Sequence, residues 1–351
     1  MQNVTGQFAE IIRHAAAQRQ PLCIRGSGSK DFYGGQLSGN VLDTRPYGGI
    51  ISYQHDELVL TARAGTPLLE IEKILSEHDQ MLPFEPPYFG SAATLGGCVA
   101  AGLSGPRRAY QGAVRDFVLG VRMLDGRADI LTFGGQVMKN VAGYDVSRLL
   151  TGSMGTLGVL LNISLKVLPR PVAEATVRFD MGETQALAAM NRWAGQPLPL
   201  SASCYHDHVL TLRLSGAARA VQAAQDKLGG SMVEAGASFW RGVREQEMDF
   251  FKTDLPLWRL SLPSVTPPVN LPGIQLIEWG GALRWWKTDA DAQTVRNAAA
   301  AAGGQASLFR GADKSTGVFH PLPAPLLQIQ KKLKHAFDPH GIFNVGRMYD
   351  F

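Results

Sequence analysis

Three clusters of glycine and other small residues in the first half of the 351-residue chain constrain its fold more than any other feature. They occupy residues 25–30, 92–102 and 143–159. Glycine allows the backbone to adopt positive φ angles and to approach a neighbouring group closely. A single cluster of this kind also serves an ordinary turn or β-bulge. Three clusters before residue 171 favour a domain that surrounds a large, flat ligand over a domain in which each cluster only turns the chain.

The first cluster, RGSGSK at residues 25–30, follows a short apolar run that predicts a strand. A dinucleotide-binding Rossmann loop is excluded because Asp31 replaces the third glycine and because no amphipathic helix follows. A Walker phosphate loop is excluded because the sequence contains no Gly-Lys-Ser/Thr. The loop is therefore either a plain turn or a nest of backbone N–H groups that binds phosphate oxygens.

The composition excludes several classes of protein. The net charge of +4 is spread along the chain without a basic block, so nothing predicts nucleic-acid binding. Cys23, Cys98 and Cys204 are far apart, which argues against a zinc site, a disulfide framework or an iron–sulfur cluster held by this chain alone, and favours a reducing compartment. The first residues do not read as a signal peptide, and no apolar run is long enough to span a bilayer. We therefore expect a cytoplasmic protein that reaches the inner face of a membrane only through partner subunits.

The pattern of apolar residues predicts an α+β protein with two domains and a tail. The first domain is expected over residues 1–171, where Pro169-Arg170-Pro171 ends it. Residues 172–325 contain two loosely similar α+β halves, which predict one antiparallel sheet with a ferredoxin-like layout. Residues 326–351 are expected to form a helix and a turn-rich tail. The strongest local patterns predict a helix over 66–78 capped by Thr66, a hairpin over 117–135 and an alternating strand over 158–169.

Several short motifs, taken in their order along the chain, resemble the FAD-binding domain of the vanillyl-alcohol oxidase and p-cresol methylhydroxylase (PCMH) flavoprotein family. The motifs are RGSGSK, GTPLLEIEKIL, ATLGG, RDFVLGVRMLDG and GYDVSRLLTGSMGTLGVL with ISLKVLPRP. The tail FDPHGIFNVGR resembles the closing motif of that family. The resemblance covers residues 1–171 and 331–351. It implies a PCMH-type FAD-binding domain of two subdomains, to which the tail returns, and a second α+β domain.

The resemblance also implies which parts of the chain bind FAD. The loop 25–30 would hold the pyrophosphate, and residues 91–97 would line the diphosphate and the ribityl chain. Residues 106–112 would pass near the isoalloxazine ring, with Gly158 and Val159 on the adenine side. The implied FAD-binding residues are Arg25, Gly26, Ser27, Gly28, Ser29, Lys30, Pro87, Ser91, Ala92, Ala93, Thr94, Gly96, Gly97, Gly102, Gly158, Val159, Asn344, Gly346 and Arg347.

Two features of the sequence bear on how the chain would bind FAD. Some family members bind FAD covalently through a His or Cys at the edge of the flavin. The matching loop here, LSGPRRAYQG at residues 103–112, contains neither residue, so non-covalent FAD is predicted. The tail reads Asn-Val-Gly at residues 344–346 where many members have Asn-Pro-Gly, which loosens the turn that would close over the flavin.

The variants EPPYFGSAATLGG and QLIEWGGALRWWK resemble family members that are subunits of multi-subunit oxidases. The resemblance implies an FAD-dependent oxidoreductase that acts on the CH–OH group of a 2-hydroxy acid, with glycolate oxidised to glyoxylate. It implies two partners, a second FAD-containing catalytic subunit and an iron–sulfur subunit. Without a cysteine cluster, electrons that leave this flavin need an acceptor outside the chain, so the flavin either meets substrate or only relays electrons. Two alternatives stay open: a self-sufficient flavin dehydrogenase for another small hydroxy acid or alcohol, and a structural subunit that retains a flavin fold.

No catalytic residue stands out in the sequence. Oxidation of a 2-hydroxy acid requires a group that takes the hydroxyl proton and cations that bind the carboxylate. Arg107 and Arg108 are the candidates for carboxylate binding, and FAD phosphate, a partner surface or solvent are the alternatives for them. His206 and His208 have no apparent third ligand, so a turn with two histidines is favoured over a metal site, and no metal is predicted.

Overall fold

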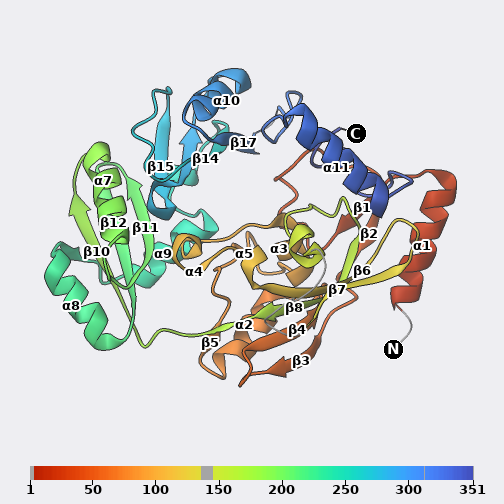
Figure 1. Cartoon of the computed structure of the whole chain (residues 1–351), viewed down its shortest axis with the longest axis horizontal. Coiled ribbons are helices and arrows are strands. Elements are labelled where there is room, and N and C mark those ends of the chain that lie inside the picture. Colours follow the sequence, from red (N-terminus) through yellow and green to blue (C-terminus); the bar gives the residue numbers. More distant parts are fainter. Residues whose placement is uncertain (1–3, 136–144, 312, 351) are drawn as a thin grey trace.

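The computed structural model describes residues 4–135, 145–311 and 313–350, and its strands form two main sheets (Figure 1). The small sheet has five strands, and the large sheet has eight. Neighbouring strands in both sheets run antiparallel. The chain crosses to the large sheet between β9 (Leu168–Pro169) and β10 (Ala173–Asp180), beside the position where the sequence predicts a domain boundary.

The small sheet carries the main core of the first part of the chain. Its strands are β3 (Ile50–Gln54), β4 (Val59–Arg63), β6 (Val118–Leu124), β7 (Ile130–Gly134) and β8 (Val159–Lys166), in the order β3-β4-β8-β6-β7. Helices α2 (Leu68–Ser76) and α3 (Leu95–Ala101) bury their apolar residues in the same core. The predicted hairpin is confirmed as β6 and β7, with Gly120 opposite Gly134. The predicted alternation in β8 is wrong, because β8 lies at the centre of the sheet and most of its residues are buried.

The N-terminal elements and the tail lie side by side at one end of the molecule (Figure 1). Helix α1 (Val4–Gln18) precedes β1 (Leu22–Arg25), which pairs in parallel with β2 (Asn40–Asp43). Helix α11 (Ala324–Phe337) leads into the tail, where Phe343 forms a bridge with Leu22 and joins the buried cluster beneath α1. The tail therefore lies against the first strand.

The large sheet consists of two four-stranded halves with the same strand order. The first half contains β10, α7 (Glu183–Ala194), β11 (Leu200–His206), β12 (Val209–Gly216), α8 (Ala218–Leu228) and β13 (Ser231–Met232). The second contains β14 (Leu257–Ser261), β15 (Ile274–Glu278), β16 (Leu283–Lys287), α10 (Ala292–Ala301) and β17 (Gln305–Arg310). The orders β13-β10-β12-β11 and β17-β14-β16-β15 match, and β11 pairs with β15 to join the halves. The predicted antiparallel, ferredoxin-like sheet is confirmed.

Shorter elements make the connections between the sheets. They are β5 (Gln80–Met81), α4 (Arg108–Gln111), α5 (Val114–Phe117), α6 (Val146–Leu149), α9 (Gly236–Glu245) and the 3-10 turns Asp249–Phe251 and Trp279–Gly281. Strand β5 pairs with β9. Within the described ranges, no helix combines the length and the apolar character that a membrane span requires.

A buried ionic cluster joins the first part of the chain to the large sheet. The Glu85 carboxylate accepts two hydrogen bonds of 2.9 Å from the Arg213 guanidinium on β12 and one of 3.0 Å from Nε of Arg107. Both arginine side chains are 5% exposed, and Arg107 also contacts Glu174 on β10. Burial disfavours the Glu85 carboxylate, but Arg213 and Arg107 outweigh it and hold the pKa of Glu85 below its ordinary value. The cluster therefore fixes how the two parts of the chain meet.

Candidate functional site

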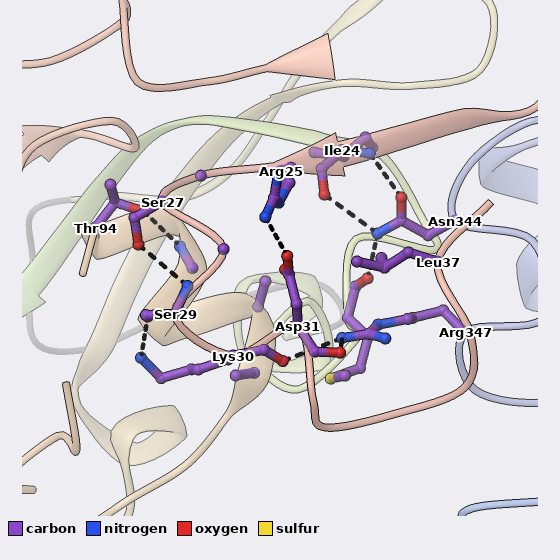
Figure 2. A pocket seen from close by; sticks show the side chains of 16 residues that line it. Ile24, Arg25, Ser27, Ser29, Lys30, Asp31, Leu37, Thr94, Asn344 and Arg347 are labelled. Atoms are coloured by element: carbon purple, nitrogen blue, oxygen red, sulfur yellow. Dashed lines mark hydrogen bonds and ion pairs between the residues drawn. The ribbon is translucent and has the colours of Figure 1, made fainter. Parts of the chain in front are cut away.

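A pocket at the end of β1 brings three distant segments of the chain together. Figure 2 shows Thr94, at the start of α3, on one side of the loop that follows β1, and the tail residues Asn344 and Arg347 on the other side. The pocket is lined by Ile24, Arg25, Gly26, Ser27, Gly28, Ser29, Lys30, Asp31, Leu37, Thr94, Gly97, Ala100, Ala101, Met154, Asn344 and Arg347. The whole loop 25–30, which the family resemblance implies as the pyrophosphate loop, thus faces one concave surface.

The glycines of this loop leave backbone N–H groups available to a ligand. Gly26 lies so close to α3 that an added Cβ would be 2.5 Å from Oγ1 of Thr94. Gly28 has a φ of +78°, and an added Cβ there would collide with the guanidinium of Arg25. The N–H groups of Gly26, Ser27 and Gly28 donate no hydrogen bond to the described part of the chain. A nest of this kind can hold phosphate oxygens, so the nest is favoured over the plain turn.

Positive charge surrounds the loop. Arg25 pairs with Asp31 at 2.5 Å, and the Nζ of Lys30 donates to the carbonyl oxygen of Tyr88 at 3.2 Å. Burial lowers the pKa of Lys30, which means that its charged form gains from a nearby anion. With Arg347, three cations and one acidic residue, Asp31, are among the described residues that line the pocket. Such an excess of positive charge suits a diphosphate group.

Two tail residues hold the loop in place. The side-chain oxygen of Asn344 accepts a hydrogen bond of 2.7 Å from the N–H of Ile24, and its amide donates to the carbonyl oxygen of Met154 at 2.6 Å. Arg347 donates to the carbonyl oxygens of Lys30 and Asp31, both at 3.1 Å. Both side chains are buried. Asn344 and Arg347, both implied as FAD contacts, line the pocket, but their polar atoms already bond backbone groups of the chain.

Replacing Asn344 with alanine is expected to lower the free energy of unfolding by about 1–3 kcal/mol, because the N–H of Ile24 and the carbonyl of Met154 lose a buried partner. Asn344 also has a φ of +40°, a conformation that asparagine tolerates better than alanine. Urea unfolding followed by circular dichroism measures the difference. Gln328→Ala on the exposed face of α11 is the matched control and should leave the midpoint unchanged. Equal midpoints for the two variants would contradict the clamping role of Asn344.

The remaining residues implied as FAD contacts do not line this pocket. Gly96, Gly102 and Gly158 are packed so closely that an added Cβ would come within 3 Å of a neighbouring atom. Ala93 and Val159 are buried, Ser91 and Ala92 are exposed, Pro87 lines a second pocket, and Gly346 lines a recess beside the tail. Gly143 and Tyr144 of the third cluster lie outside the described residues. A direct role of these residues in binding FAD stays a prediction.

The two arginines predicted as carboxylate binders have different surroundings. Arg107 is committed to Glu85 and Glu174 in the buried ionic cluster, so it is not available to a substrate. Arg108 lies over the ring of Trp279, with 4.3 Å from its Cζ to the ring centroid. Its guanidinium forms no ion pair or side-chain hydrogen bond with any residue that the structure describes. Of the two candidates, Arg108 is the one whose guanidinium is not paired with a carboxylate of the described residues.

The two histidines singled out by the sequence flank a turn. His206 ends β11, and its Nδ1 lies 3.0 Å from the carbonyl oxygen of Gln275. Asp207 and His208 have φ angles of 50° and 60°, so they turn the chain into β12 and the two rings do not share a strand face. Across residues 4–135, 145–311 and 313–350, no group of three His, Cys, Asp or Glu side chains is placed to hold a metal ion.

A second pocket, which was not predicted from the sequence, lies between the first part of the chain and the large sheet. Phe89, Arg259, Glu278 and Trp279 are among its lining residues. One signal was available in the sequence, because Glu278 is a lone carboxyl group next to the apolar run of β15. A buried carboxyl group in a pocket is a candidate for a functional role.

Comparison with known proteins points to one kind of chain. Residues 4–134 match the family described as the FAD binding domain. The glycolate oxidase subunit GlcE of Escherichia coli (strain K12) is 50% identical over 340 residues, which cover 97% of this chain and 96% of that protein. The glycolate oxidase subunit GlcD of Bacillus subtilis (strain 168) is 30% identical over 176 residues, 49% of this chain and 37% of GlcD. A solved structure of alkyldihydroxyacetonephosphate synthase has a similar fold, with a TM-score of 0.66 at 14% identity, and covers 97% of this chain and 74% of that one.

Proposed function

Since the chain belongs to the family of the glycolate oxidase subunit GlcE, we propose that it is the FAD-binding subunit of a glycolate oxidase complex and takes part in the oxidation of glycolate to glyoxylate. The chain is an FAD-dependent oxidoreductase of the type that acts on CH–OH groups. Bound FAD supplies the hydride acceptor for such a reaction. The observation that carries the proposal is the pocket at the end of β1, with its unused N–H groups and its excess of cations.

Each part of the pocket has a role in this proposal. The N–H groups of Gly26 to Gly28 would hold oxygens of the FAD diphosphate, and Arg25 and Lys30 would balance its charge. Asn344 and Arg347 stabilise the conformation of the loop through hydrogen bonds to its backbone. No His or Cys lines the described pocket or occurs in the loop 103–112, which supports non-covalent FAD.

The chain acts as one subunit of a multi-subunit oxidase. We further propose that its partners are a second FAD-containing catalytic subunit and an iron–sulfur subunit. All three cysteines of this chain are buried, and they lie in three separate elements, so they offer no cluster that could take electrons from the flavin. This arrangement supports an acceptor on another subunit. The partners would also account for any contact with a membrane.

The visible absorption spectrum of the purified chain, before and after acid precipitation, tests the cofactor. We expect a yellow protein whose flavin appears in the supernatant, because the proposed contacts are all non-covalent. Flavin that stays in the pellet would contradict non-covalent binding. A colourless chain that takes up no added FAD would overturn the proposal and favour a structural subunit. Anaerobic glycolate then distinguishes two roles, since bleaching of the flavin means that this chain meets substrate itself.

A further inference from the structure

The two halves of the large sheet differ in how the chain passes from their first strand to their second. In the first half, helix α7 lies between β10 and β11. In the second half, residues 262–273 connect β14 to β15, and the structure describes all of them without a helix or a strand. This connecting loop, residues 262–273, therefore takes the place that a helix has in the other half.

The side chains of the connecting loop divide into two sets. Leu262 and Leu271 are buried in the core that this half of the sheet shares with α10. Val265 is 75% exposed, and Ile274, the first residue of β15, is 53% exposed. The prolines of the loop are exposed as well, and they are Pro263, Pro267, Pro268 and Pro272. One side of the loop thus completes the core, and the other side presents an apolar surface to the outside.

The outer surface of the connecting loop carries no charge. Residues 262–274 read LPSVTPPVNLPGI, a run without Asp, Glu, Lys, Arg or His. Contiguous exposed apolar residues mark sites of interaction on a folded protein, and the centres of protein–protein interfaces are depleted of charged residues. A run without cations does not suit an anionic lipid surface. The pattern therefore favours a protein surface as the occupant.

A buried arginine fixes the backbone of the connecting loop. The side chain of Arg284 is fully buried, and its guanidinium donates to the carbonyl oxygens of Thr266 and Pro267, the latter at 3.0 Å. The carboxylate of Glu183 on α7 is 3.8 Å from Nη1 of Arg284. Burying a guanidinium at that distance from a counter-charge is costly. What the buried group provides in return is a set of hydrogen bonds that hold the loop in one conformation.

Two further side chains anchor the ends of the connecting loop. Nε1 of Trp286 donates to the carbonyl oxygen of Pro272 at 3.0 Å, and Nδ2 of Asn191 on α7 donates to that of Ser264 at 3.1 Å. Each proline in the loop also fixes its own φ angle. A segment that is already held in one conformation loses little entropy when a partner binds it, which favours affinity. The connecting loop is therefore both apolar and preorganised.

We propose that the connecting loop is a docking site for another subunit of the oxidase complex, which covers it with an uncharged apolar groove. Val265, at the exposed turn between Pro263 and Thr266, would be the central side chain of this contact. The inference rests on the proposed complex, because it needs a partner subunit. It names the surface of this chain that the partner would cover.

The test uses the complex, recovered through an affinity tag on this chain from cells that also make the other two subunits, which mass spectrometry identifies. Val265→Asp should lower the ratio of partner subunits to this chain by about tenfold to a hundredfold, because it places an unpaired charge in an apolar interface. Val172→Asp, at a valine that is 86% exposed between β9 and β10, is the matched control and should recover the partners as the wild type does. Both variants should keep their flavin, since both side chains are exposed.

Hydrogen–deuterium exchange provides a measurement that needs no variant. The N–H groups of residues 264–271 are expected to exchange more slowly in the complex than in the isolated full-length chain. Equal exchange in the two, or wild-type recovery of the partners by Val265→Asp, would overturn the inference and leave the proposed function intact. A dimer of this chain alone that Val265→Asp separates would also overturn it, because a second copy would then be the occupant. A wild-type chain that recovers neither a second flavin subunit nor an iron–sulfur subunit would overturn the proposed complex instead.

Discussion

Replacing Glu85 with alanine is expected to lower the free energy of unfolding by about 3–5 kcal/mol, the cost of leaving a buried charge without its partner. Glu85 neutralises Arg213 and Arg107, whose side chains are 5% exposed and cannot turn to solvent. Without the carboxylate, Arg107 keeps its contact with Glu174, but Arg213 loses the ion pair that the structure shows for it. Urea unfolding of the purified chain, followed by circular dichroism, measures the loss. A drop below about 1 kcal/mol would mean that water replaces the carboxylate and that the cluster does not hold the two parts of the chain together.

Two controls separate the charge from the side chain. Glu57→Ala removes an exposed carboxyl group and should leave the stability unchanged. Glu85→Gln keeps the shape and one acceptor, so it should cost less than alanine but more than Glu57→Ala. Since the folded pKa of Glu85 lies below its ordinary value, its contribution is present above about pH 4.3 and is lost as the pH falls through the folded pKa. The difference between wild type and Glu85→Gln should therefore shrink on acidification below pH 4.

Gly26→Ala is expected to remove most of the bound flavin. The added Cβ would stand 2.5 Å from Oγ1 of Thr94, so the loop must move away from α3 and the nest of N–H groups is distorted. Overpacking of this kind costs about 1–3 kcal/mol, which corresponds to a fall in FAD affinity of about fivefold to more than a hundredfold. Titration of the flavin-free chain with FAD, followed by quenching of flavin fluorescence, measures the affinity.

A control variant adds the same methyl group at a glycine that has no close neighbour. Gly182 has an ordinary φ of −71°, and no atom lies within 4 Å of an added Cβ, so Gly182→Ala should bind FAD as the wild type does. Removing the colliding hydroxyl in the double variant Gly26→Ala, Thr94→Ala should restore part of the affinity. The restoration is partial because Oγ1 of Thr94 also accepts the N–H of Gly97 at the start of α3. Unchanged FAD affinity in Gly26→Ala would remove the main support for a phosphate site in this loop.

Local patterns in the sequence predicted much of the fold. Alternation and turn residues predicted the β6–β7 hairpin, and the repeated order of strands and helices predicted the large sheet. Helix α3 was missed, because its two glycines are poor helix formers and the segment reads as a turn. It forms because Thr94 caps its first turn and because Leu95, Cys98 and Val99 are buried in the core. Packing partners outweighed local propensity.

The start of the helix predicted from residue 66 also depends on contacts that the local sequence pattern does not reveal. The sequence predicts Thr66 as its cap, but the hydroxyl of Thr66 donates to the carbonyl oxygen of Arg63 and accepts from the N–H of Gly49. Pro67 then occupies the cap position without a side-chain hydrogen bond. Gly49 precedes the edge strand β3, which the sequence pattern also missed. Because these partners depend on the sheet, only the assembled fold reveals them.

Some features of the candidate site could be identified from the sequence, and others could not. The loop 25–30 could be identified as a candidate because its small residues are typical of a turn or a phosphate-binding nest, and the family resemblance pointed to the nest. The commitment of Arg107 could not, because its partners Glu85, Glu174 and Ser215 come from three separate segments. Arg108 and Arg259 both lie beside the ring of Trp279, and this placement likewise depends on how the large sheet meets the connection after β5. A charged residue in a sequence is a candidate for binding a ligand. Only the fold shows whether another side chain already neutralises that charge.

The bond between Ile24 and Asn344 spans 320 positions of the chain. A ribosome makes the loop at the end of β1 320 residues before the side chain of Asn344, which fixes it. During that time the small sheet and the large sheet can form, but the bridge between Phe343 and Leu22 of β1 cannot. The pocket proposed for the cofactor is therefore completed only after both sheets have been made, and a chain cut before residue 344 lacks the side chain that finishes it.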